Sequence, residues 1–220
     1  MNTWIDRPFS GAQQMMDDDR KMAETLPEGE RHFCLYEWGD RGVTYGFKQD
    51  LPGDLGEGSA LCIDGGRRAT GGGIVFHNPG DLVIACAAPL HDGNFPNPLH
   101  QKMATIRDLF QRTFQVLNID LNPRPCSKDD SDPNWKQFCA SYPNPYELFY
   151  QDSKILALTL RRFKTSILIQ GILHLHDNHR TFNDVAQYAP YFSAGLPDKH
   201  RPGIHEIRDT LKQEIQKHFV

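Results

Sequence analysis

Residues 67–77 decide the fold, and they read Arg67-Arg68-Ala69-Thr70-Gly71-Gly72-Gly73-Ile74-Val75-Phe76-His77. Three consecutive glycines lose much backbone entropy on folding, so some feature of the molecule must require them. A loop of bare N–H groups lets an anionic ligand approach closely. The two neighbouring arginines can add bidentate contacts to phosphate or carboxylate. The stretch is therefore a candidate anion-binding loop in front of a strand that ends at His77. The alternative is a flexible hairpin turn with a solvated arginine pair.

Apolar residues at three- and four-residue intervals predict helices elsewhere in the chain. These helices are expected over residues 12–26, 103–117 and 204–219. Ser10 followed by Gln13 is a capping-box signal for the start of the first helix. The three aspartates at 17–19 are predicted to lie on a solvated face of that helix.

Strands are expected where β-branched, aromatic and aliphatic residues run between turn residues. They cover residues 32–38, 41–50, 60–64, 73–77 and 81–88, and then a meander of three strands over 146–150, 154–162 and 165–175. Consecutive strands with a few helices predict an α+β fold with mixed, mostly antiparallel sheets flanked by helices. We expect residues 1–220 to form a single domain.

Composition excludes several classes of protein. The formal net charge of -4 argues against a general nucleic-acid binder. The first residues lack the basic start and apolar run of a secretory signal, and no stretch approaches a membrane span of roughly 18 apolar residues. Five cysteines without a CxxC pair fit reduced thiols in a cytoplasmic protein. His174, His176 and His179 invite comparison with a metal site, but no cysteine or matched carboxylate set completes a zinc pattern, so no metal is expected.

Four stretches resemble one family, the lipoate–protein ligases and their octanoyltransferase relatives. RRATGGGIVFHNPGDL (67–82) resembles the family signature RRxTGGGxVxH. SGAQQMMDDDRKMAE (10–24) is similar to the family's opening helix, and WGDRGVTYGFKQ (38–49) to its strand-turn-strand. FCASYPNPYELFYQDSKI (138–155) resembles the segment that contains the family's essential lysine.

The resemblance implies a fold related to biotin protein ligases and class II synthetases. It implies that Gly71, Gly72 and Gly73 line the acyl and adenylate channel and that Arg67 or Arg68 lies at its entrance. Thr70 would belong to the same substrate-binding stretch, and His77 would border the substrate pocket. Lys154 would be the essential lysine, which contacts the acyl carbonyl and, in ligases, the adenylate phosphate. The alternative for Lys154 is a solvated lysine that closes the turn over 151–154.

Two reactions are compatible with the resemblance. A ligase would use MgATP to activate lipoic or octanoic acid as an acyl-adenylate, and the three glycines after RRxT favour this reaction. An octanoyltransferase would instead take the acyl group from an acyl carrier protein through a thioester on Cys139. Residues 157–160 (ALTL) resemble the transferases at the strand that follows the lysine. In either case the acceptor would be a lysine of a lipoyl domain in a 2-oxoacid dehydrogenase or of a glycine-cleavage H protein.

A non-catalytic binding relative of the same fold is the third possibility, motivated by residues 157–160 and by Ile169-Gln170-Gly171 in place of the family's frequent Gln-His-Gly. Too few residues follow the catalytic region for a full C-terminal accessory domain, so a separate accessory protein could replace it.

Overall fold

Nine strands form two sheets in the computed structural model, which describes residues 1–56, 61, 63–95, 98–124, 137–139 and 144–219. The six-stranded sheet has the order β1 (Asn2–Ile5), β2 (Arg31–Glu37), β6 (Leu82–Pro89), β9 (Ser166–Leu173), β8 (Ser153–Arg162) and β7 (Leu148–Tyr150). Only β1 and β2 pair in parallel, and the other neighbours are antiparallel. The predicted meander is confirmed as β7, β8 and β9.

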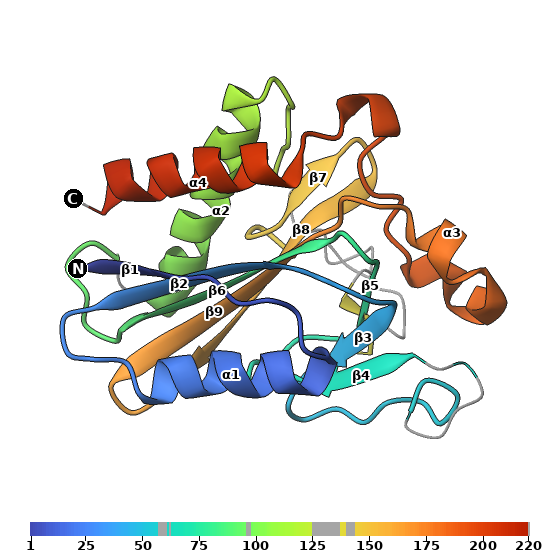
Figure 1. Cartoon of the computed structure of the whole chain (residues 1–220), viewed down its shortest axis with the longest axis horizontal. Helices are drawn as coiled ribbons and strands as arrows, with labels where there is room; N and C mark the ends of the chain where they lie inside the picture. The colour runs from blue at the N-terminus through green and yellow to red at the C-terminus, as the bar shows by residue number, and fades with distance from the viewer. Residues whose placement is uncertain (57–60, 62, 96–97, 125–136, 140–143, 220) are drawn as a thin grey trace.

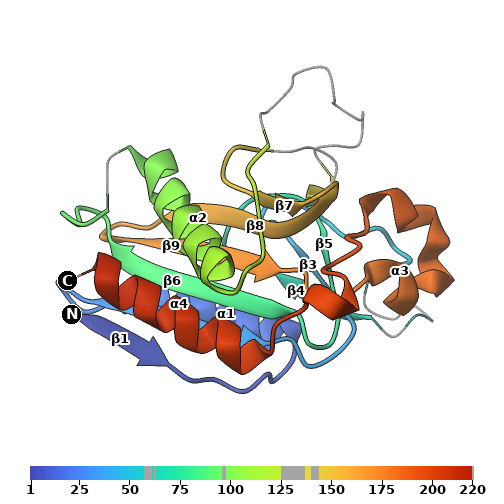
Figure 2. The same cartoon turned by 90° about the horizontal axis from the view of Figure 1, so that it is seen from above.

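Helices cover both faces of this sheet, as Figures 1 and 2 show. Helix α1 (Ala12–Glu24) packs on one face, while α2 (Leu99–Val116) and α4 (Ile204–His218) pack on the other. Alternate residues of a strand point to opposite faces, so Val83 belongs to the core under α1 and Ile84 to the core under α2 and α4. Burial on both faces explains why β6 and β9 are almost uniformly apolar.

A three-stranded sheet lies beside the large one and contains the glycine-rich stretch. Its order is β4 (Asp64–Arg67), β3 (Gly42–Tyr45) and β5 (Val75–His77). The β3–β4 pair is parallel and the β3–β5 pair antiparallel. This sheet therefore holds both ends of the loop over 68–74. The prediction of an α+β fold with mixed, mostly antiparallel sheets is confirmed.

A small helical region follows β9 and packs against this smaller sheet (Figure 1). It consists of α3 (Asn178–Thr181) and the 3-10 helix Asn183–Tyr191. A second 3-10 helix, Asp198–His200, lies beside β7, where His200 meets Tyr150, and precedes α4.

Two local predictions are wrong. Ser10 does not cap α1, because its hydroxyl meets the Met15 sulfur at 3.5 Å. The first helical N–H, that of Ala12, donates instead to the Asp64 carboxylate at 2.7 Å. The strand expected over 60–64 begins only at Asp64 and continues to Arg67; residues 60 and 62 lie outside the described ranges.

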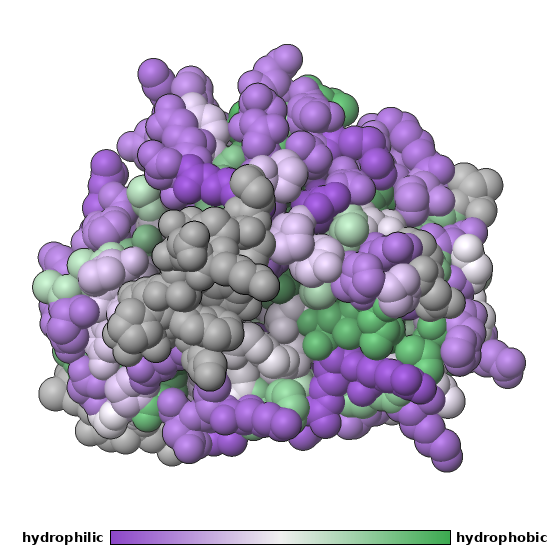
Figure 3. All heavy atoms as spheres, turned by 180° about the vertical axis from the view of Figure 1, so that it is seen from behind, coloured by the Kyte–Doolittle hydropathy of each residue, from purple (hydrophilic) through white to green (hydrophobic). Residues whose placement is uncertain are grey.

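Among the described residues, the exposed large apolar side chains are Met1, Phe47 and Val116. Most of the face in Figure 3 is hydrophilic, and its largest apolar area lies to the right of the central grey residues. Within the described ranges, no helix has both the length and the apolar character needed to cross a membrane.

Candidate active site

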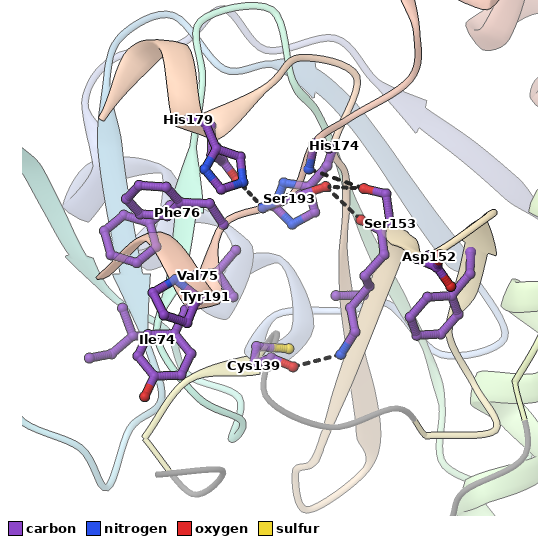
Figure 4. Close-up of a pocket in the computed structure, with 17 residues that line it drawn as sticks. Ile74, Val75, Phe76, Cys139, Asp152, Ser153, His174, His179, Tyr191 and Ser193 are labelled. Atoms are coloured by element: carbon purple, nitrogen blue, oxygen red, sulfur yellow. Dashed lines mark hydrogen bonds between the residues drawn. The ribbon is translucent and has the colours of Figure 1, made fainter. Parts of the chain in front are cut away.

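Two cavities meet between the sheets. The glycine-loop cavity has a volume of about 430 Å³ and is bordered by Gly71–Gly73, Arg68 and apolar side chains of α1, β6, β8 and β9. The Lys154 cavity has a volume of about 290 Å³ and is bordered by Lys154, by polar residues and by aromatic rings. Both cavities share Val75, Cys139 and Ala157 in their walls. In Figure 4, Ile74, Val75, Phe76 and Tyr191 face the Lys154 cavity from one side, and Asp152 and Ser153 lie opposite them.

The three consecutive glycines differ in whether the surrounding protein requires a glycine at their position. A Cβ on Gly73 would lie 2.5 Å from the Cys139 nitrogen, so a side chain does not fit there. Gly72 has a φ of +86°, which side chains disfavour. A Cβ on Gly71 would meet no described atom within 4 Å, so Gly71 faces open space. Only at Gly71 does nothing in the described protein require a glycine, so this position is the candidate for close approach of a ligand.

The loop is joined to the segment 137–139 through backbone hydrogen bonds. Ile74 N–H donates to the Gln137 carbonyl at 2.6 Å, and Cys139 N–H donates to the Ile74 carbonyl at 3.0 Å. These bonds, together with the tight packing at Gly73, fix Cys139 beside the glycine run.

The two arginines have different positions. Arg68 is buried and borders the glycine-loop cavity. Its guanidinium donates to the Thr44 hydroxyl at 2.7 Å and to the carbonyls of Gly71 and Gly73 at 3.1 and 2.6 Å. Burial lowers the pKa of Arg68 to about 10, so it stays charged at neutral pH. Arg67 points away, lies over the Tyr45 ring and pairs with Asp50, and it borders neither cavity.

Lys154 lies near the junction of the cavities as one member of a buried ion pair. Its ammonium is 2.6 Å from the Glu147 carboxylate and donates to the Cys139 carbonyl, also at 2.6 Å. Lys154 is 6% exposed and Glu147 is fully buried. The alternative of a solvated lysine is therefore wrong. Burial raises the pKa of Glu147, and the nearby Lys154 ammonium opposes that rise.

The Cys139 thiol is 3.8 Å from the Glu147 carboxylate. Burial raises the pKa of Cys139, and this effect outweighs the opposing attraction of Lys154. A raised pKa disfavours the thiolate, which is the nucleophilic form of cysteine.

His77 borders the glycine-loop cavity. It stacks on the Trp38 ring at 4.0 Å between centroids, and its Nε2 is 2.7 Å from the Thr44 hydroxyl. Burial lowers the pKa of His77 well below its ordinary value. Thr70 does not border either cavity, because its hydroxyl points into the protein and donates to Gln170 at 2.7 Å.

Asp19 is fully buried, so the prediction of a solvated face is wrong at this position. It accepts hydrogen bonds from Arg7, Tyr36 and Gln170. A signal for this burial exists in the sequence, because position 19 lies three and four residues after Met16 and Met15, on the apolar face of the helix. Glu147 was also not predicted as a site residue. The signal for its burial in the sequence was its position directly before the apolar residues of β7.

The pKa of Asp19 makes stability depend on pH. Burial raises this pKa from 3.8 to about 6, so the folded protein binds a proton more tightly than the unfolded chain. The contribution of this group to stability is full below pH 4 and is lost as pH rises through 6, by about 3 kcal/mol. We expect Asp19→Asn to flatten this part of the stability profile, measured by urea unfolding between pH 4 and 7. An equally steep profile in the variant would contradict the assignment to Asp19.

The donor set of the site does not resemble a resident metal centre. Among the described residues, no group of three or more His, Cys, Asp and Glu side chains could hold a metal ion. His174 and His179 both border the Lys154 cavity. His174 instead lies 3.5 Å from the Asp81 carboxylate.

Comparisons with known proteins agree with this geometry. A family model described as the lipoyl protein ligase A/B catalytic domain matches residues 12–219. The chain is similar to the T. acidophilum protein Ta0514 with bound lipoic acid (18% identity, TM-score 0.68, 99% of this chain and 85% of that chain). It is also similar to lipoate-protein ligase A bound with ATP, at 18% identity and a TM-score of 0.67 over 99% of this chain and 84% of that chain. A third similar structure is P. falciparum LipL1 in complex with lipoate, at 13% identity and a TM-score of 0.66 over 100% of this chain and 62% of that chain. No curated protein sequence matches the chain. At these identities the solved structures show a shared fold.

Proposed function

Because the chain belongs to the lipoyl protein ligase A/B catalytic domain family, we propose that it is an ATP-dependent lipoate–protein ligase. It activates lipoic or octanoic acid as an acyl-adenylate and transfers the acyl group to a lysine of a lipoyl domain. The observation that carries this proposal is the pair of cavities that meet near Lys154. A thioester-dependent transferase needs a cavity for the acyl chain, whereas a ligase also needs one for a nucleotide.

Each cavity suits one part of the acyl-adenylate. The glycine-loop cavity is largely apolar, and its volume of about 430 Å³ lies in the usual range for small-molecule sites. It suits an acyl chain whose carboxylate reaches the junction. The Lys154 cavity offers the rings of Phe149, Tyr191 and Phe192 for a base and Lys154 for a phosphate.

The chemistry has two steps. A carboxylate oxygen of the acid attacks the α-phosphorus of ATP, and pyrophosphate leaves. The neutral amine of the acceptor lysine then attacks the acyl carbonyl and an amide bond forms. AMP leaves with the electron pair of the broken C–O bond, and the amine nitrogen releases one proton to solvent. Negative charge develops on the carbonyl oxygen in the second step, and a fixed ammonium in a dry site stabilises it. Glu147 and the Cys139 carbonyl hold the Lys154 ammonium at that place.

Magnesium fits this reaction as a companion of ATP. Mg²⁺ keeps several waters and is usually bound by one or two carboxylates plus substrate phosphates. Asp152 borders the Lys154 cavity and is the exposed carboxylate available there, although it also pairs with Arg124.

The sequence-predicted binding residues divide into three groups under this proposal. Gly71, Arg68 and His77 border the cavity for the acyl chain, and Gly72 and Gly73 shape its wall. Thr70 lies outside the cavity and fixes the loop through its hydrogen bond to Gln170. Arg67 lies outside both cavities, where its charge would meet the nucleotide or the acceptor only at the surface.

We propose a lipoyl domain of a 2-oxoacid dehydrogenase as acceptor, with the glycine-cleavage H protein as the other candidate. A solved structure similar to this chain is described as a bi-partite lipoate protein ligase and its E2 lipoyl domain from Thermoplasma acidophilum (17% identity, TM-score 0.67). That description also supports an accessory protein as a partner of this chain, which we propose acts as a single catalytic domain in the cytoplasm.

Octanoyl transfer through Cys139 is the second candidate, because this thiol borders both cavities. The raised pKa of Cys139 argues against it. A non-catalytic binding role is the third candidate, and the intact Lys154–Glu147 pair argues against that role.

The test is the intact mass of a lipoyl domain after incubation with the chain, lipoic acid and MgATP. The ligase proposal expects a lipoyl mass gain that disappears when ATP is omitted. A parallel incubation supplies octanoyl carrier protein without ATP. A mass gain only in this second incubation would replace the ligase by the transferase, and no gain in either, with accessory protein present, would favour the binding role.

Cys139→Ser separates the two chemistries directly. A ligase does not use the thiol, and serine keeps a small polar group beside Glu147, so we expect ATP-dependent transfer to continue at a rate near that of the wild type. The rate is measured from the same mass gain over time. Complete loss of transfer, with an unchanged melting temperature, would show that the thiol takes part in the reaction.

A further inference from the structure

A chain of buried hydrogen bonds connects helix α1 to the start of the glycine run. The Gln170 amide nitrogen donates to Asp19 at 2.8 Å, and the Thr70 hydroxyl donates to the Gln170 amide oxygen at 2.7 Å. Asp19 and Thr70 are fully buried, and Gln170 is 3% exposed. The three residues come from α1, β9 and the loop over 68–74, which are far apart in the sequence.

Asp19 determines which way the Gln170 amide faces. Arg7 and Tyr36 also donate to Asp19, at 3.0 and 3.1 Å, so the polar partners of this carboxylate among the described residues are all donors. A carboxylate only accepts, which turns the NH₂ group of Gln170 toward Asp19 and its oxygen toward Thr70. A reversed amide would set an oxygen against the carboxylate and would leave the Thr70 hydroxyl without an acceptor, at the cost of a buried unsatisfied group.

The chain of bonds ends at the wall of the glycine-loop cavity. Gln170 borders that cavity together with Met16 of α1, and the next residue after Thr70 is Gly71. The backbone around Thr70 is held by Phe47, whose N–H donates to the Thr70 carbonyl at 3.1 Å, and by Arg161, which donates to the Ala69 carbonyl at 2.7 Å. The Thr70 hydroxyl ties this backbone to the large sheet.

We propose that Asp19 is a positioning residue for the acyl site, because it orients the Gln170 amide, which in turn fixes Thr70 and the glycine run along the cavity wall. The proposal rests on the proposed function for its kinetic consequence. Asp19 contacts no substrate in this scheme. Its removal therefore weakens binding of the acyl acid more than it slows the chemical step.

The expected effects follow from the individual bonds. Thr70→Val keeps the size of the side chain and removes one buried hydrogen bond, so KM for lipoic acid should rise on the order of tenfold while kcat changes little. Gln170→Glu sets two buried carboxylates against each other, and their shared proton is lost as pH rises. Its KM should therefore rise further as pH increases from 6 to 8.5.

A double variant provides the rescue. In Asp19→Asn with Gln170→Glu, the new amide at position 19 donates to the new carboxylate at position 170, which still accepts from Thr70. The Tyr36 hydroxyl shares Oδ2 of Asp19 with Gln170, so in this variant it turns to accept from the same NH₂ group. The number of buried negative charges stays at its original value. We expect KM near that of the wild type and no steep dependence on pH. Tyr36→Phe is the matched control, because it removes a donor to Asp19 without touching Gln170 or Thr70, and its KM should stay nearly unchanged.

Amide hydrogen exchange of residues 70–73 gives a readout that does not need the reaction. Exchange should be faster in Thr70→Val and Gln170→Glu and return to the wild-type rate in the double variant. If the wild type transfers no acyl group while exchange follows this order, the proposed function fails and the positioning by Asp19 stands. If the wild type is active but the double variant restores neither KM nor exchange, or Thr70→Val changes neither, the positioning proposal is overturned.

Discussion

Lys154→Ala should abolish acyl transfer, with a loss of at least 10²–10³-fold in rate, because the fixed ammonium is the group that meets the developing negative charge. The measurement is the lipoyl mass gain of the acceptor domain at saturating lipoic acid and MgATP. The same substitution should also destabilise the folded protein. Removal of the ammonium leaves Glu147 buried and without its counter-charge, which costs about 3 kcal/mol and lowers the melting temperature by roughly 10 °C.

The loss of stability has a defined dependence on pH. Burial already raises the pKa of Glu147, and without Lys154 the attraction that opposes this rise disappears. The folded variant therefore binds a proton at position 147 more tightly than the unfolded chain does. Its deficit in the free energy of unfolding should be small at acid pH and should grow as pH rises toward neutrality.

A double variant separates catalysis from folding. Lys154→Met with Glu147→Gln removes both buried charges and keeps the volume of the two side chains, so the melting temperature should return close to that of the wild type. Acyl transfer should remain absent. A folded double variant that transfers lipoate at the wild-type rate would remove Lys154 from the mechanism.

Gly73→Ala is the second change with a large expected effect. The new Cβ would lie 2.5 Å from the Cys139 nitrogen and 2.6 Å from the Phe138 carbonyl carbon, both of them backbone atoms that cannot turn away. The segment 137–139 must therefore move, and with it the Cys139 carbonyl that accepts from Lys154. A shift of about 1 Å in a catalytic group can cost about 10²-fold in rate. We expect a loss of this size in kcat, measured by the acceptor mass assay.

Gly71→Ala is the matched control in the same loop. A Cβ at position 71 meets no described protein atom within 4 Å, and the backbone there does not need a left-handed φ. The melting temperature should stay at its wild-type value. Because Gly71 borders the glycine-loop cavity, the added methyl group should raise KM for the acyl acid and leave kcat nearly unchanged. Equal losses of kcat in both variants would show that the loop responds to any side chain, and would contradict a specific steric conflict between a side chain at position 73 and the segment 137–139.

The kind and order of most elements could be predicted from the sequence. Helices α1, α2 and α4 and strands β7, β8 and β9 lie where apolar periodicity and β-branched runs place them, because these patterns report which faces are buried. The start of α1 at Ala12 agrees with the prediction. Its capping group could not be predicted, since it is a carboxylate 52 residues away in the sequence. Ser10 carries a local capping signal, but Asp64 accepts from the first helical N–H instead, because its strand packs beside the helix.

Some residues of the candidate site could likewise be predicted from the sequence, and others could not. The sequence by itself determined the glycine run and the arginine pair as a candidate site, because they form one dense local motif. The roles of His77 and Lys154 came only from the resemblance to a known family. Only the tertiary structure decided that Arg68 and not Arg67 borders the cavity, that Glu147 pairs with Lys154, and that Asp19 meets Gln170 from 151 residues away. The physical reason is that the cost of burying a charged group depends on the partners that surround it. Those partners come from segments that are brought together only when the chain folds.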